Sequence, residues 1–219
     1  MLRKTFSQEI KEIKDEILLL SSMVEKAVTD SVLALTENDL DRSQQVFSDA
    51  TLIKRRCYEI EMSIIVLMAT QQPIARDLRT LAASLDICTE LKRIGEYAKS
   101  IANINLLSEG LSVPAVLRDV YSMAERAVEM LHAAMTTYVD EDIQSAIVVI
   151  QDDDRVDEWY TKLYHDAISI ILKDARNIEP ANYILWVAHH LERLGDRATN
   201  ICERVVYMVT GERLEPSPV

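Results

Sequence analysis

Apolar residues recur along the chain at alternating spacings of three and four positions, which is the pattern of helices that bury one face. The clearest run lies near the C-terminus and consists of Val187, Leu191, Leu194, Ala198, Ile201, Val205 and Met208. A run with the same spacing lies near the N-terminus and consists of Ile10, Ile13, Ile17, Leu20, Val24 and Ala27. Helix-breaking and turn-favouring residues interrupt the pattern at Asn38-Asp39, Gln72-Pro73, Gly110 with Pro114, Val139-Asp140, Asn177 to Pro180 and Gly211. The pattern therefore predicts six long helices.

The two halves of the chain repeat each other. Residues 91–98 match residues 191–198 at an offset of 100, and residues 23–28 match residues 123–128 at the same offset. The second helices align best at an offset of 103, with Ile53 opposite Val156. Because short turns force successive helices to run antiparallel, we expect an all-α fold of two tandem three-helix bundles.

We expect the first repeat to occupy residues 1–108, the second residues 109–212, and a disordered tail residues 213–219.

Composition agrees with helices and narrows the function. Hydrophobic residues make up 48% of the chain, and only 4 glycines and 5 prolines occur. The formal net charge of −12 argues against nucleic acid as a partner, because the phosphate backbone would be repelled. The three cysteines form no CxxC pair, and the N-terminus lacks the apolar run of a secretory signal. We therefore expect a cytoplasmic protein with free thiols.

Carboxylates gather on the last two predicted helices. Glu192 and Asp196 are four residues apart and lie on one stripe of the sixth helix, opposite its apolar face. In the fifth helix, Asp153 and Asp157 fall at successive positions of the predicted apolar seam. This seam consists of Ile143, Ala146, Ile150, Asp153, Asp157, Tyr160, Tyr164, Ala167 and Ile171.

The expected turns bring these carboxylates together. If the turn between the fifth and sixth helices centres near residue 176, Asp157 lies opposite Gly195, between Glu192 and Asp196. A turn near residue 139 places Glu125 opposite Asp153. Like charges about 5.5 Å apart repel by roughly 3 kcal/mol at an effective dielectric constant of 20. A bound cation with oxygen ligands would relieve this repulsion, whereas neighbouring arginines, protonation or a fully solvated acidic face are the alternatives.

Three segments resemble the PhoU family. Residues 190–201 and 205–212 are similar to its second repeat, and residues 71–79 resemble the turn that enters its third helix. The likeness runs from about residue 5 to residue 212. It implies an acidic E(D)xxxD motif in each repeat, on which some family members bind iron or zinc.

The family motif matches fully at only one of its two expected places. It is present as Glu192 and Asp196, whereas the corresponding pair of the first repeat is Lys92 and Glu96. Lys54 likewise stands where Asp157 stands in the second repeat. We therefore expect any multivalent metal to prefer the second repeat, and two lysines to lie close together in the first. The candidate metal ligands are Glu192, Asp196, Asp153, Asp157, Glu125 and Glu96.

The resemblance also implies a function. PhoU proteins are regulators without a reaction of their own, so the chain is expected to regulate phosphate uptake and phosphate-starvation signalling negatively. The implied partners are the ATPase subunit of the phosphate ABC transporter and the phosphate sensor histidine kinase, with the membrane reached only through them. Spare apolar faces on long helices favour a homodimer.

Two alternatives to this reading remain from the residues alone. One is a helical scaffold or adaptor that binds no ligand. The other is a di-iron carboxylate enzyme, which requires an ExxH pair on each of two helices, whereas only Glu129 and His132 form one.

Overall fold

The protein is all-helical, as predicted. The computed structural model describes residues 2–108, 111 and 114–214, and no strand occurs within these ranges. The α-helices are α1 (Leu2–Glu37), α2 (Leu40–Gln71), α3 (Ala75–Ser108), α4 (Pro114–Asp140), α5 (Ile143–Gln151), α6 (Asp153–Lys173) and α7 (Ile178–Thr210). A single turn of 3₁₀ helix (Ala175–Asn177) connects α6 to α7.

The helices end where the sequence predicted turns. Asp39 caps the N-terminus of α2 by accepting a hydrogen bond from the Arg42 backbone N–H at 2.9 Å. Asp142 caps α5 in the same way, through the backbone N–H groups of Gln144 and Ser145. Gly211 ends α7 with a φ of 83°, a left-handed conformation that a glycine adopts without steric cost.

The predicted fifth helix is interrupted at Asp152, which separates α5 from α6. The predicted seam of this segment is wrong in part, because Val149, Val156 and Leu163 take the buried positions. Asp157 and Tyr164, each one residue further along, are exposed. Three apolar side chains seven residues apart supply a core stripe without the cost of desolvating a carboxylate, so they face inward.

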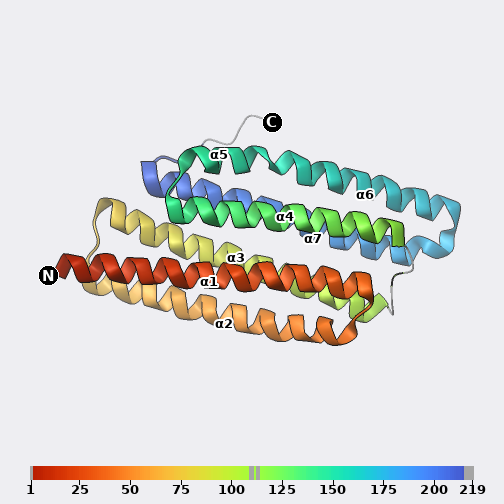
Figure 1. Cartoon of the computed structure of the whole chain (residues 1–219), viewed down its shortest axis with the longest axis horizontal. Coiled ribbons are helices and arrows are strands. Elements are labelled where there is room, and N and C mark those ends of the chain that lie inside the picture. Colours follow the sequence, from red (N-terminus) through yellow and green to blue (C-terminus); the bar gives the residue numbers. More distant parts are fainter. Residues whose placement is uncertain (1, 109–110, 112–113, 215–219) are drawn as a thin grey trace.

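The two three-helix bundles lie side by side (Figure 1). Helices α1, α2 and α3 form the first repeat, and α4, α5–α6 and α7 form the second. The repeats meet where α3 packs on α7 and α1 packs on α4, so that α2 and α5–α6 are outermost. None of the helices in the described part of the chain is long and apolar enough to cross a membrane.

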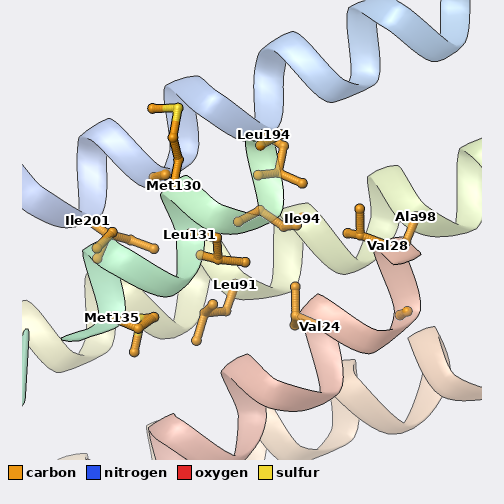
Figure 2. Close-up of a cluster of buried hydrophobic side chains, with 14 of the residues drawn as sticks. Val24, Val28, Leu91, Ile94, Ala98, Met130, Leu131, Met135, Leu194 and Ile201 are labelled. Carbon is orange, nitrogen blue, oxygen red and sulfur yellow. The ribbon is translucent and has the colours of Figure 1, made fainter. Parts of the chain in front are cut away.

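One hydrophobic core runs through both repeats. Figure 2 shows Val24 of α1, Leu91 of α3, Leu131 of α4 and Leu194 of α7 in the same buried cluster. Leu91 and Leu191, which correspond in the repeat, are both fully buried. The internal symmetry predicted from the sequence is therefore present in the packing.

Polar side chains also join the repeats. The hydroxyl oxygens of Ser84 on α3 and Tyr138 on α4 lie 2.6 Å apart, and both side chains are completely buried. Arg197 of α7 pairs with Glu90 of α3 at 3.2 Å. These contacts fix the two bundles in one relative orientation.

The predicted C-terminal tail falls only partly within the described residues. Arg213 and Leu214 follow α7 without helical structure. Residues 215–219 lie outside the described part of the chain, as do residues 109 and 110 at the predicted boundary between the repeats.

Candidate functional site

Four carboxylates come together between α6 and α7, and we call them the carboxylate cluster: Asp153, Asp157, Glu192 and Asp196. Asp153 of α6 lies against the backbone of α7 at Gly195. Its Oδ1 atom is 2.7 Å from the point that a Cβ atom would occupy on Gly195. Because this glycine has no side chain, the carboxylate can lie directly against α7.

Burial and mutual repulsion oppose ionisation of the cluster. Desolvation, followed by the charges of Asp157 and Asp196, raises the pKa of Asp153 to about 6. Desolvation and the charge of Asp196 also raise the pKa of Asp157 and that of Glu192. At neutral pH the cluster therefore carries negative charges that burial and mutual repulsion make unfavourable.

Nearby cations offset little of this charge. His189 Nδ1 lies 3.4 Å from Glu192 Oε2, yet this buried oxygen has no hydrogen-bond partner among the described residues. Arg197 approaches Asp196 only to 3.9 Å and makes its shorter contact, 3.2 Å, with Glu90. Compensation by arginines, one of the alternatives to a metal, is therefore weak at this cluster.

An oxygen-rich set of this kind suits a cation. The cluster offers carboxylate oxygens from two helices, one of them buried without a hydrogen-bond partner, beside a glycine that allows close approach. Within the described ranges, however, no group of three or more His, Cys, Asp or Glu side chains has the geometry to hold a metal ion as it stands. Metal binding would therefore need rotamer changes in these side chains, and it stays a prediction.

The register of α6 against α7 differs by one turn from the one predicted. Asp153, rather than Asp157, lies against Gly195. The connecting 3₁₀ turn, Ala175–Asn177, lies at the predicted centre, but the pairing of Asp153 with Gly195 is displaced from the register that a centre at residue 176 predicts. The four carboxylates still meet, because Asp157 lies one turn further along the same side of α6.

Neither of the two remaining candidate ligands belongs to the carboxylate cluster. Glu125 is exposed on α4 and interacts with the phenol of Tyr121. One residue further on, Arg126 pairs with Asp152 at 2.5 Å. Glu96 is exposed on α3 of the first repeat.

The two lysines of the first repeat come together as predicted. Lys54 of α2 and Lys92 of α3 line one open pocket, which we call the basic pocket; its lining residues are Lys54, Lys92, Arg93, Glu96, Tyr97 and Arg193. Lys92 pairs with Glu61 at 3.2 Å rather than with Glu96. Sequence reasoning missed the contribution of Arg193, because it comes from the other repeat and depends on how α3 packs on α7.

Comparison with known proteins gives the same family along most of the chain. The family model described as "PhoU domain" matches residues 17–104 and, a second time, residues 120–205. A relative from Clostridium acetobutylicum, named "Phosphate-specific transport system accessory protein PhoU homolog", is 31% identical over 216 residues, which are 98% of this chain and 99% of the relative.

Two solved structures share the fold. The crystal structure of PhoU from Pseudomonas aeruginosa superposes with a TM-score of 0.88 at 31% identity, covering 94% of this chain and 100% of that one. The phosphate transport system regulatory protein PhoU from Streptococcus pneumoniae gives a TM-score of 0.87 at 27% identity, with 96% and 100% covered. Both likenesses extend over the two repeats, so the carboxylate cluster and the basic pocket both lie within the shared fold.

Proposed function

Because the chain belongs to the PhoU family, we propose that it is a negative regulator of phosphate uptake and phosphate-starvation signalling. The observation that carries this proposal is the similarity over nearly the full length to a protein named as an accessory protein of the phosphate-specific transport system. A neighbour in structure is likewise named a regulatory protein of phosphate transport. The protein acts by binding its partners and catalyses no reaction of its own.

The proposed partners are the ATPase subunit of the phosphate ABC transporter and the phosphate sensor histidine kinase. The protein meets them in the cytoplasm and reaches the membrane only through them. Support for a reducing compartment comes from its cysteines, since Cys57, Cys88 and Cys202 are all free and buried.

A homodimer is part of the same proposal. Helix α2 is outermost and carries an exposed apolar stripe formed by Tyr58, Met62, Ile65 and Val66. Large apolar side chains at helical spacing on a surface favour association with another protein surface. Light scattering of the purified protein measures whether it is a dimer.

We further propose that the carboxylate cluster binds a metal ion, with iron or zinc as the first candidates. A cation would neutralise charges that now repel each other and would hold α6 against α7. In such a site Asp153, Glu192 and Asp196 are partly buried ligands, and Asp157 is the exposed one. Elemental analysis of protein purified without chelator measures which metal is present.

Deletion of the gene tests the regulatory role. In phosphate-rich medium, the deletion strain should keep phosphate-starvation genes switched on or take up phosphate without restraint, and the intact gene should restore control. The protein should also co-purify with the transporter ATPase or the sensor kinase. Normal phosphate control in the deletion strain, together with no binding to either partner, would contradict the proposal.

The same strain separates the proposal from its closest alternative. A variant of the carboxylate cluster, Asp196→Asn, should disturb phosphate control if metal binding is part of regulation. If the variant restores control as well as the intact gene while losing its metal, the protein regulates as a scaffold that needs no ligand.

A further inference from the structure

The basic pocket opens between three helices of the two repeats. Lys54 comes from α2, Lys92, Arg93 and Tyr97 come from α3, and Arg193 comes from α7. The pocket has a volume of about 370 Å³. This volume is at the lower end of the roughly 300–1,000 Å³ that small-molecule sites occupy.

Positive charge in the pocket exceeds what its surroundings neutralise. Lys54 has no ion-pair partner in the part of the chain that the structure describes. Arg193 lies over the ring of Tyr97 at 5.1 Å, and no carboxylate among the described residues pairs with it.

Two further cations of the pocket are paired only in part. Lys92 makes one ion pair, with Glu61 at 3.2 Å, and an ammonium group has three donors. Arg93 pairs with Glu90 at 2.9 Å and is half exposed. The single carboxylate that lines the pocket belongs to Glu96. Donors are therefore left over for a ligand.

The basic pocket is the pseudo-symmetric counterpart of the carboxylate cluster. Lys92 corresponds to Glu192 at the offset of 100, and Lys54 corresponds to Asp157 at the offset of 103. The glycine that follows Lys92 and Glu192 by three residues is also present in both repeats. Gly95 faces Ile53 in the first repeat, as Gly195 faces Val156 in the second. The same groove between the second and third helices of a repeat thus carries acidic groups in one half and basic groups in the other.

We propose that the basic pocket binds a small tetrahedral oxyanion, with inorganic phosphate as the probe of this chemistry. The planar guanidinium of Arg193 and the ammonium groups of Lys54 and Lys92 are donors that suit phosphate oxygens. Because the chain has a net charge of −12, a local excess of cations is needed for an anion to approach at all. This site is distinct from the proposed metal site, and its occupancy does not rest on the regulatory function.

Calorimetric titration of the full chain with inorganic phosphate at constant ionic strength tests the proposal. We expect binding at roughly millimolar concentration or below, and a loss of about tenfold or more in affinity for Lys54→Gln. Arg55→Gln is the matched control, because Arg55 is the next residue of α2, is also exposed and does not line the pocket. No phosphate binding by the wild type, or the same loss in both variants, would overturn the proposal.

A double variant tests the charge inversion directly. Lys54→Asp combined with Lys92→Glu gives the first repeat, together with Glu96, three of the four carboxylates that its counterpart carries, while Ala50 stays at the position of Asp153. The double variant should abolish phosphate binding and add a site for Zn²⁺ or Mn²⁺, measured as a second equivalent in a metal titration. Circular dichroism checks that the variant is as helical as the wild type. A folded double variant that still binds phosphate with wild-type affinity would show that these lysines do not form an anion site.

Discussion

Asp153 Oδ1 lies only 2.7 Å from the point where a Cβ atom on Gly195 would stand. Real Cβ atoms do not come this close to a neighbouring atom, so the carboxylate occupies space that only a glycine leaves free. The corresponding Cβ point on Gly95 lies 3.1 Å from a methyl group of Ile53. A glycine at the same place in each repeat thus makes room for a charged group in one case and an apolar group in the other.

Gly195→Ala should weaken metal binding at the carboxylate cluster by about tenfold, because the new methyl group displaces one charged ligand. The free energy of unfolding should change by less than about 1 kcal/mol, since alanine favours the helix by a similar amount. Metal titration and urea denaturation measure the two effects. Gly95→Ala is the control and should leave metal affinity unchanged, so an equal loss in both variants would contradict the prediction.

Asp196→Asn should reduce the affinity for a multivalent metal sharply, because the cluster loses one charged oxygen ligand. Glu96→Gln should have little effect, because Glu96 lies in the basic pocket beside Lys54 and Lys92. Titration of both purified variants with Zn²⁺ or Fe²⁺ measures the difference. Equal losses, or a loss in Glu96→Gln alone, would show that the metal does not prefer the second repeat.

Asp153→Asn should stabilise the metal-free protein at pH 7 and above. The folded-state pKa of Asp153 is raised from 3.8 to about 6, so its protonated form favours folding below pH 4 and this contribution is lost as the pH rises through 6. Asparagine removes the charge, and the gain should be roughly 1 kcal/mol once solvent screening of this half-exposed group is allowed for. Urea denaturation in the presence of chelator at pH 4.5 and pH 7.5 measures it. A gain of the same size at both pH values would mean that ionisation of Asp153 is not its cause.

Tyr138→Phe should lower the free energy of unfolding by about 1 kcal/mol. Ser84 Oγ keeps the hydrogen bond that it donates to the Thr80 carbonyl oxygen at 2.8 Å, but it loses the one that it accepts from the Tyr138 hydroxyl. This pair joins α3 to α4, so the loss weakens the contact between the repeats. Thermal denaturation followed by circular dichroism measures the change. Tyr58→Phe, at a side chain that is 62% exposed, should shift the midpoint by less.

The helices could be predicted from the sequence because each one's buried face is set by its own residues. The run from Val187 to Met208 is buried throughout at its predicted positions. The break at Asp152 was missed, since no glycine or proline marks it. In α5–α6, the sequence allowed either of two neighbouring stripes of residues to face the core. The stripe that contains Val156 is buried, in place of the one that contains Asp157.

Contacts within one repeat were predictable to about one helical turn, and contacts between repeats were not. A short turn limits how far α6 can slide along α7, so the four carboxylates were expected together and are together. Which of them lies against Gly195 depends on the 3₁₀ turn at Ala175–Asn177, whose geometry has no clear signal in the sequence. The position of Arg193 over Tyr97 depends on the packing of α3 on α7, for which the repeat pattern gives no register.

The core shared by the two repeats has a consequence for how the molecule comes apart. Helices α1 and α3 bury apolar side chains against α4 and α7, so neither half could separate without exposing them to water (Figure 2). The chain should therefore melt in a single cooperative transition rather than one repeat after the other. A strained or loosened site in one half then lowers the melting temperature of the whole, and a ligand that tightens one half protects the other half from proteolysis.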